Sequence, residues 1–294
     1  MFPAVRQRTI GQAVGCSGIG LHTGCKVNMR LLPAAADTGI IFRRVDLSNF
    51  VVPATVDMVA RVSYATTLMR LGVMVATVEH VLSALVGCGI DNCIVELDCL
   101  EVPILDGSAR SFVDLIRSAG IVEQSVPRVY LRVLERVEVT DGNRYIMIEP
   151  YEGFVIDSTI EFAHPLIGQQ RYIYDASTCS YAEEIALART FGFEREIATL
   201  RAAGLIKGGT LNNAIVLSED GMLNAGPLNY EDEFARHKVL DIIGDLALAG
   251  WPIWGKVTAY RSGHGLHARL LSRLLQTTKA WELVEAEVTE VIHI

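Results

Sequence analysis

The sequence predicts an α+β protein made of two related halves whose helices face each other. Its 294 residues are half hydrophobic, which suits two domains of ordinary size. Short β-type runs alternate with helical segments, and this pattern restarts after a polar, proline-containing bridge at residues 122–133. The same order of features, a histidine opening an apolar helix and then glycines and a strand, occurs in "EHVLSALVGCGIDNCIVEL" and in "RHKVLDIIGDLALAGWPIWGKVTAY".

The first half is expected to contain strands and two helices. The strands are β-branched and apolar runs between turn signals, at residues 26–32, 39–44 and 92–97. A helix is expected at 79–87, because glycines interrupt the apolar pattern at its end. A second helix is expected within 106–120, with Ser108 as its N-cap and Gly120 just past its end.

The second half begins in the bridge, which we take as the boundary between an N-terminal domain (1–125) and a C-terminal domain (126–294). A hairpin is expected at 136–150, because Asp141-Gly142 between two alternating runs is a strong two-residue turn signal. The later elements are expected as helices near 177–186 and 194–203, a strand at 213–217, a helix at 234–250, a strand at 255–260 and a helix at about 266–276.

Composition excludes several classes of protein. The net charge of −8 and the pI of about 5.4 argue against a nucleic-acid-binding protein, which would show a basic footprint. Mean hydropathy is +0.31, yet no apolar run approaches the ~20 residues that a membrane span needs. The first residues, "MFPAVRQRTIGQAVG", lack the apolar core of a secretory signal, so we expect a cytoplasmic protein. The six cysteines form no C-x-x-C pair, which argues against a zinc ribbon or redox motif.

The helix expected at 234–250 is apolar on nearly every side, yet it carries a polar stripe. His237, Asp241 and Asp245 recur every four residues and therefore share one face. Burying an uncompensated carboxylate costs several kcal/mol, so the stripe must meet partners. One interpretation is an ordinary ion pair between residues four apart; the other is a metal site or a polar cleft.

Two histidines and one carboxylate form a common catalytic zinc site, in which an open fourth position takes water. His237 and Asp241, one turn apart, can reach one ion, and His80 at the start of the first-half helix is the best candidate for a third ligand. Glu79 precedes it, and neighbouring helical residues point about 100° apart. Glu79 could therefore take a proton from the water. A non-haem iron site uses the same three ligand types.

A further histidine is placed for proton transfer. His264 lies in the glycine-flanked turn "RSGHGL", where a strand meets a helix, and Asp245 could hold its imidazole while it protonates a leaving group. An exposed turn histidine is the alternative. The remaining four histidines have less defined surroundings: His22, His164, His267 and His293.

With these residues in place, the chain resembles the UDP-3-O-acyl-N-acetylglucosamine deacetylases, the zinc amidases of lipid A biosynthesis in Gram-negative bacteria. The resemblance runs from "QRTI" near the start to "WELV" near the end. Its ordered motifs are "GIGLHTG" (18–24), "TVEH" (77–80), "EVPILDGSA" (101–109), "ARTFGF" (188–193), "YEDEFARHKVLDIIGDL" (230–246) and "SGH" (262–264).

The resemblance implies a mechanism. Zn²⁺ would be bound by His80, His237 and Asp241, with Glu79 as the general base. His264, oriented by Asp245, would be the general acid, and Thr190 would help to stabilise the oxyanion. The products would be acetate and the free amine, in the committed step of lipid A biosynthesis. The resemblance also implies a monomer whose two α/β two-layer sandwich domains each carry a small insert.

It further implies how a UDP-linked, acylated glucosamine would be bound. Lys238 would contact the nucleotide portion, and Phe162, with Glu161 beside it, would pack near the uracil. Arg144 and Arg261 stand where relatives carry lysine and would lie near the diphosphate. The remaining candidates would line the site wall and the acyl-chain passage: Leu21, Phe191, Leu205, Ile206 and Ala214.

Our hypothesis is therefore zinc-dependent hydrolysis of the 2-acetamido group of UDP-3-O-acyl-N-acetylglucosamine. Three alternatives belong to other classes: an amidase acting on a different nucleotide sugar, a silent binding protein and an Fe(II) oxygenase. The Glu79–His80 pair argues against the last two, and the run of motifs argues against all three.

Overall fold

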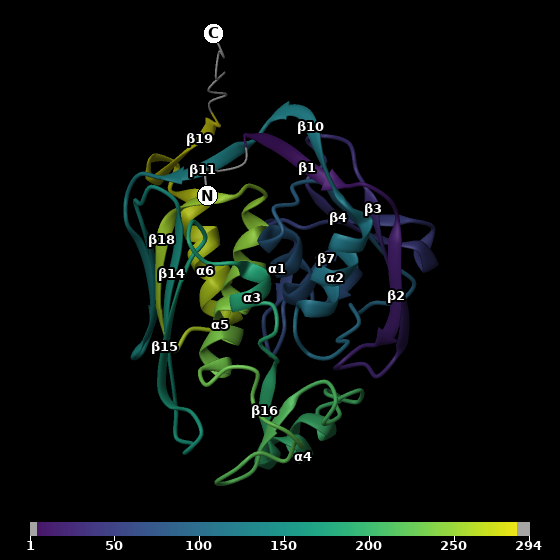
Figure 1. Cartoon of the computed structure of the whole chain (residues 1–294), viewed down its shortest axis with the longest axis vertical. Helices are drawn as coiled ribbons and strands as arrows, with labels where there is room; N and C mark the ends of the chain where they lie inside the picture. The colour runs from purple at the N-terminus through teal and green to yellow at the C-terminus, as the bar shows by residue number, and fades with distance from the viewer. Residues whose placement is uncertain (1–4, 287–294) are drawn as a thin grey trace.

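The computed structural model describes residues 5–286 and confirms the α+β prediction. Two sheets form the outer layers of the molecule, and helices fill the space between them (Figure 1). In the middle of this space α1 (Glu79–Gly87) packs against α5 (Glu233–Leu246), one helix from each half of the chain. The prediction that the helices face each other is therefore confirmed.

The N-terminal half is built on a five-stranded sheet. Its strands, in spatial order, are β2 (Val14–Ile19), β3 (Lys26–Pro33), β9 (Cys93–Leu97), β4 (Ile40–Arg44) and β5 (Phe50–Pro53). An insert between β5 and α1 forms a second, small sheet of β6 (Val59–Arg61), β7 (Thr67–Arg70) and β8 (Val73–Ala76). Helix α2 (Arg110–Ala119) follows β9, and β1 (Arg6–Ile10) pairs with β10 (Ile121–Pro127) as a separate ribbon.

The C-terminal half is built on a seven-stranded sheet. The main path is β12 (Val137–Asp141), β13 (Arg144–Glu149), β18 (Ile253–Tyr260), β11 (Val129–Val133) and β19 (Trp281–Glu285). Strand β14 (Phe154–Phe162) pairs with β18 and with β15 (Gly168–Asp175). Helices α5 and α6 (His264–Gln276) cover its inner face (Figure 1). The insert of this half contains β16 (Phe191–Phe193), α4 (Glu194–Ala202) and β17 (Ile215–Leu217).

One apolar core joins the two halves. Val81, Leu82 and Leu85 of α1 are fully buried in the same cluster as Val239 and Leu240 of α5. Burying one such side chain contributes roughly 1.5–3 kcal/mol. This shared core fixes the relative position of the two helices and therefore of the polar residues between them.

Three element predictions need correction. Helix α2 begins at Arg110, and its N-cap is Ala109; Ser108 lies one residue earlier, where its hydroxyl oxygen accepts a hydrogen bond from the Arg110 N–H (3.1 Å). The helix expected near 177–186 shrinks to α3 (Tyr181–Glu184), because Asp175 accepts hydrogen bonds from the backbone and hydroxyl of Ser177 and so forms a turn instead.

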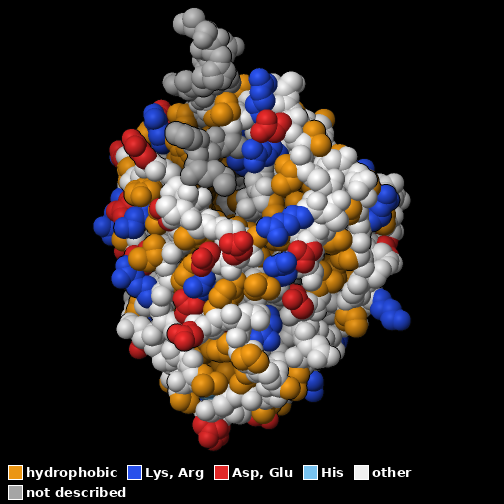
Figure 2. Space-filling view, viewed as in Figure 1, with side chains coloured by type: hydrophobic (Ala, Val, Ile, Leu, Met, Phe, Trp, Pro, Cys, Tyr) orange, Lys and Arg blue, Asp and Glu red, His pale blue; other side chains and the backbone are white. Residues whose placement is uncertain are grey.

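The third correction concerns α6, which begins at His264, two residues before its predicted start. The boundary proposed after residue 125 falls inside β10. No helix among residues 5–286 is both long and apolar enough to cross a membrane. Positive and negative side chains are interspersed on the face shown in Figure 2.

Candidate metal and proton-transfer site

The site lies where α5 crosses the first turn of α1. The two helices approach so closely at Gly244 that a Cβ atom there would lie 2.0 Å from the carbonyl oxygen of Glu79. Any side chain at this position would push the helices apart. The missing side chain therefore lets the polar stripe of α5 meet the histidine of α1.

Three potential ligand atoms converge at this crossing. His80, His237 and Asp241 each offer one atom, all within 4.8 Å of one another. Asp241 Oδ1 lies 3.9 Å from His80 Nε2 and 3.5 Å from His237 Nε2, so neither contact is a normal hydrogen bond. The three residues are only 4 %, 2 % and 2 % exposed. These three atoms are buried, point toward one another and form no hydrogen bond with one another, an arrangement that fits the ligands of a cation.

The protonation states also fit a cation. Burial, and then the neighbouring His237, lower the pKa of His80 to about 3, and burial lowers the pKa of His237. Burial alone would raise the pKa of Asp241, but Lys238 and the nearby histidines outweigh it, and the pKa is lowered well below its usual range. At neutral pH the cluster is therefore two neutral imidazoles and a carboxylate, all able to donate electron pairs.

The rings of the two histidines are held differently. His237 Nδ1 lies 3.0 Å from the carbonyl oxygen of Ala188, which leaves Nε2 for a cation. His80 Nδ1 is buried and has no hydrogen-bond partner among residues 5–286. Its ring stands perpendicular to that of His237, with centroids 5.1 Å apart.

Lys238, expected to contact the nucleotide, lies beside the cluster. Its Nζ donates to Asp241 Oδ2 at 2.8 Å and lies 5.4 Å from the centre of the Phe191 ring. In this position its charge stabilises the deprotonated Asp241.

A second cluster of the same residue types lies one turn further along α5. Asp245 Oδ2 is 2.7 Å from His264 Nδ1 and also 2.7 Å from His267 Nδ1. Its other oxygen accepts a hydrogen bond from the Thr66 hydroxyl (2.6 Å). The predicted contact between Asp245 and His264 is present, and His264 is the first residue of α6 rather than an exposed turn residue.

This contact sets the charge of His264. Burial alone would lower the pKa of His264, but the Asp245 carboxylate and its hydrogen bond outweigh burial and raise the pKa to about 10. The pKa of Asp245 is lowered well below its usual range, because His264 and His267 outweigh burial. His264 is therefore cationic at neutral pH and able to donate a proton.

Sequence reasoning missed His267. It is 1 % exposed, and its Nε2 lies 2.9 Å from the Ser262 Oγ. The available signal was the H-x-x-H spacing of "HGLH", which places both histidines on one face once the helix starts at His264. His293, the last histidine of the chain, lies outside the described residues.

Glu79 is buried between the two clusters. Its Oε2 accepts a hydrogen bond from the Thr66 N–H (3.1 Å), and its side chain is almost fully buried. Burial raises its pKa to about 8; Asp245 and Asp241 also raise it, while His264 opposes them. A carboxylate with a raised pKa is a stronger base than an exposed glutamate.

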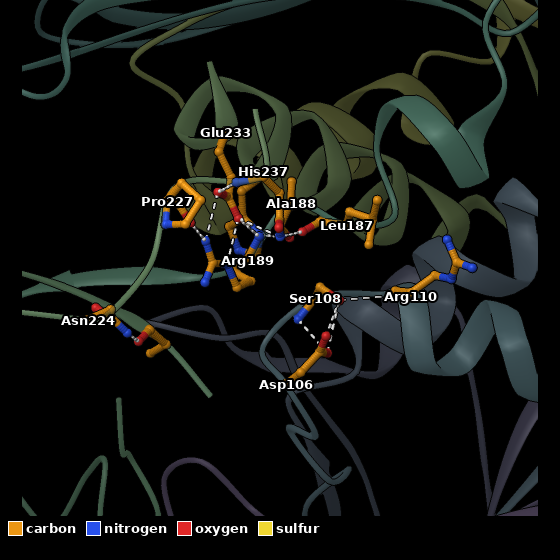
Figure 3. A network of polar contacts seen from close by, with 12 residues as sticks. Asp106, Ser108, Arg110, Leu187, Ala188, Arg189, Asn224, Pro227, Glu233 and His237 are labelled. Atoms are coloured by element: carbon orange, nitrogen blue, oxygen red, sulfur yellow. Dashed lines mark hydrogen bonds and ion pairs between the residues drawn. The ribbon is translucent and has the colours of Figure 1, made fainter. Parts of the chain in front are cut away.

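Thr190 lies in the segment that links α3 to the insert. Its N–H donates to the Gly107 carbonyl (2.8 Å), its carbonyl accepts from the Ile215 N–H (2.8 Å), and its hydroxyl has no partner among residues 5–286. Two residues earlier, Ala188 supports His237 (Figure 3). The Thr190 backbone is therefore fixed on both sides by Gly107 and Ile215, while its hydroxyl forms no hydrogen bond within the described residues.

Two candidates for the acyl-chain passage come together from opposite halves. A Cβ on Gly209 would lie 3.2 Å from the Ile206 carbonyl and 3.6 Å from Leu21 Cδ1. The turn that carries Leu21 is anchored by the buried Glu101, which accepts hydrogen bonds from the backbone of His22 and the backbone and hydroxyl of Thr23. Hydrophobic side chains gather at the lower end of the molecule (Figure 2), where Figure 1 shows β16 and α4 of the C-terminal insert.

The aromatic candidates form one cluster. The Phe162 ring lies 5.6 Å from Phe191 and 5.7 Å from Phe193. Phe162 is partly exposed.

The polar residues expected to bind the nucleotide, Glu161, Arg144 and Arg261, lie at the same end of the C-terminal sheet as Phe162. Glu161 accepts a hydrogen bond from the Tyr260 hydroxyl and lies 3.8 Å from Arg261. Arg144 is the first residue of β13, which pairs with β18 through Tyr145 and Tyr260. Its side chain forms an ion pair with Asp141. The structure thus groups Phe162, Glu161, Arg261 and Arg144 at one end of the C-terminal sheet.

Comparisons with known proteins agree with this geometry. Residues 7–276 match the family described as UDP-3-O-acyl N-acetylglycosamine deacetylase. A protein named UDP-3-O-acyl-N-acetylglucosamine deacetylase in Saccharophagus degradans is 47 % identical over 293 residues, 99 % of this chain and 97 % of that protein. Proteins of the same name in Hahella chejuensis (47 % identical; 96 % and 95 % covered) and Xanthomonas oryzae pv. oryzae (49 % identical; 95 % and 93 % covered) are similar along nearly the whole chain.

Proposed function

The chain belongs to the UDP-3-O-acyl N-acetylglycosamine deacetylase family, and on that premise we propose which of its residues carry out the reaction. The protein is a hydrolase that cleaves the 2-acetamido group of UDP-3-O-acyl-N-acetylglucosamine to acetate and a free amine, a step of lipid A biosynthesis. The observation that carries the assignment of roles is the pairing of a convergent His–His–Asp set with a buried base and a cationic histidine.

We propose Zn²⁺ as the metal of this metalloenzyme, held by His80, His237 and Asp241. Two neutral imidazoles and one carboxylate form a frequent catalytic zinc site with an open position. The lowered pKa values of all three residues support this assignment, because each is deprotonated at neutral pH. When bound, the ion would lower the pKa of a water molecule and polarise the acetamide carbonyl.

Glu79 is the proposed general base. It neighbours His80 in α1, and neighbouring helical side chains point about 100° apart. Glu79 can therefore face the attacking water while His80 faces the cation. Its raised pKa makes it a competent base, and a cation held beside it would lower that pKa toward neutrality.

His264 is the proposed general acid. Asp245 occupies its Nδ1, so its Nε2–H is free to protonate the departing amine. The Asp245 carboxylate keeps the imidazole charged until that step. The free Thr190 hydroxyl is the proposed donor to the oxyanion that forms when the carbonyl is attacked.

The substrate would extend from the site in two directions. The acyl chain would lie between Leu21 and Ile206, with Leu205 and Ala214 in the same insert. We propose that the nucleotide lies at the end of the C-terminal sheet that carries Phe162, Glu161, Arg144 and Arg261, with Lys238 and Phe191 between it and the metal site. The hydrogen bond from Lys238 Nζ to Asp241 also supports a role for Lys238 close to the reacting centre.

We further propose that the chain is divided into domains 1–125 and 126–294, that the protein is cytoplasmic and that it is a monomer.

The experiment that tests the function measures acetate release from UDP-3-O-acyl-N-acetylglucosamine by the zinc-loaded protein. A chelated sample and a chelated sample reloaded with zinc serve as controls. We expect release that disappears with chelation and returns with zinc. A folded, zinc-bound protein that released no acetate would overturn the assignment of substrate.

A further inference from the structure

The ion pair Arg189–Glu233 lies one turn of α5 before the proposed ligand His237 and has no role in the reaction proposed above. Glu233, in the first turn of α5, is 0 % exposed and faces Arg189. Its Oε1 accepts hydrogen bonds from the Arg189 backbone N–H (3.0 Å) and Nε (2.8 Å), and its Oε2 accepts from Arg189 Nη2 (3.1 Å). The Glu233 carboxylate therefore binds both the side chain and the backbone of Arg189.

The surroundings complete the set of hydrogen bonds to Glu233. The Asn229 N–H donates to Glu233 Oε2 (2.7 Å), and Arg189 Nη2 also donates to the Pro227 carbonyl (3.3 Å). Figure 3 shows Glu233 and His237 both projecting from α5 toward the segment that carries Arg189. A charged pair with so many fixed donors defines one geometry.

The pair closes a loop of contacts around a metal ligand. Glu233 and His237 are one helical turn apart, so they share a face of α5. The peptide group between Ala188 and Arg189 links the two side chains. Its N–H donates to Glu233, and its carbonyl oxygen lies 3.0 Å from His237 Nδ1. The residue after Arg189 is Thr190, whose backbone is tied on the opposite side to Gly107.

We propose that Arg189 and Glu233 are positioning residues that together fix the His237 ring toward the metal and place the Thr190 hydroxyl at the reacting carbonyl. This inference rests on the proposed function of His237 and Thr190. The pair acts through the segment Ala188–Thr190, so its loss should weaken metal binding and slow the chemical step together.

The first test is Glu233→Gln, which keeps the size of the side chain and removes its charge. Zinc affinity is measured by competition with a chromogenic chelator, and kcat and KM are measured by acetate release. Because outer contacts to metal-bound histidines typically change affinity by about 10–100-fold, we expect zinc affinity and kcat each to fall within that range. KM should stay unchanged.

A matched control lies at the other end of α1. Asp91 accepts hydrogen bonds from a backbone N–H, that of Arg8 (2.8 Å), and from Arg128 Nε (2.7 Å), much as Glu233 does. Both side chains of the Arg128–Asp91 pair are only 10 % exposed. Asp91→Asn should lower the melting temperature and leave zinc affinity and kcat at wild-type values.

A double variant separates positioning from stability. Combining Glu233→Gln with Arg189→Met removes both charges, so no ion is left buried without its partner, and the melting temperature should recover in part. Zinc affinity and kcat should remain low, because the segment is still not held. If Glu233→Gln alone fails to fold, the double variant carries the same test.

Recovery of zinc affinity together with the melting temperature would overturn the proposal, as would a Glu233→Gln protein that behaves like Asp91→Asn. The zinc measurement needs no substrate. A wild-type protein inactive on the UDP-sugar would therefore count against the proposed function, while the chelator titration would still decide the role of the ion pair.

Discussion

Helix α5 contributes one carboxylate to each of two clusters of two histidines and one aspartate. In the cluster His80–His237–Asp241 the contacts between imidazole and carboxylate are 3.5 and 3.9 Å long. In the cluster Asp245–His264–His267 both imidazoles lie 2.7 Å from one carboxylate oxygen. The nitrogen and oxygen atoms of the first cluster can therefore bind a cation, whereas those of the second cluster already form hydrogen bonds with one another.

The comparison shows that residue types alone do not decide between a metal site and a proton-transfer site. In both clusters the three potential ligand atoms lie within 4.8 Å of one another. The pKa of His80 is lowered to about 3, but the pKa of His264 is raised to about 10. The surroundings of each ring therefore set its pKa: the Asp245 carboxylate at 2.7 Å raises that of His264, and burial lowers that of His80.

The strongest test of this comparison is Asp241→Asn in the first cluster. We expect the protein to lose its zinc on dialysis and its activity to fall by more than about 10³-fold, because the metal supplies several kcal/mol of transition-state stabilisation. Metal content after dialysis and acetate release measure the two effects. A variant that stays metal-loaded and active would remove Asp241 from the ligand set.

The matched change one turn later, Asp245→Asn, should separate the clusters. Zinc should be retained, while kcat falls by roughly 10²–10⁴-fold, because His264 loses the carboxylate that keeps it charged and oriented. The same two assays apply. Loss of zinc here, as in Asp241→Asn, would mean that the second cluster belongs to the metal site after all.

The pH dependence of kcat/KM should report one group from each side of the comparison. In the mechanism we propose, Glu79 must be deprotonated and His264 protonated, so the rate should rise as Glu79 ionises and fall as pH passes the His264 pKa of about 10. Zinc bound beside Glu79 would move the acidic limb below the pKa of about 8 that Glu79 has in the metal-free protein. His264→Gln should abolish the alkaline limb and leave the acidic limb; an unchanged alkaline limb would assign it to another group.

The smallest effect is expected at His267. His267→Leu removes a hydrogen bond to a charged carboxylate, a contact that is typically worth about 1.5–3 kcal/mol, so kcat should fall by roughly 10–100-fold with zinc retained. His267→Asn keeps an N–H donor and should retain most activity. Equal losses in both variants would indicate that ring packing, rather than the donor, matters at this position.

The sequence predicted that His80, His237 and Asp241 would come together, and the structure brings them together; it predicted their surroundings less well, for a physical reason. His237, Asp241 and Asp245 are spaced along one helix, so helical periodicity places them on one face before any tertiary contact is known. His80 could be added because the same order of histidine, helix and strand occurs in both halves. The contact between His267 and Asp245 needed the start of α6 at His264, and helix boundaries are poorly determined by local pattern.

Contacts between distant segments could not be predicted from pattern. The pair Arg189–Glu233 joins residues on a loop and a helix, and neither shows a local signal of its partner. The short strands β6, β7 and β8 were also missed, because their runs of three or four residues are too brief for a clear alternation. The turn at 175–178 shows the same limit, since a side-chain hydrogen bond overrides helix propensity there.

The close approach at Gly244 has a consequence for how the protein folds. His80 belongs to one half of the chain, and His237 and Asp241 belong to the other, so a zinc ion held by all three is a cross-link between the halves. Such an ion binds the docked state only and favours it by mass action. A larger side chain at position 244 would lower metal affinity without contacting a ligand. The measured metal affinity would then report the free energy with which the two halves dock.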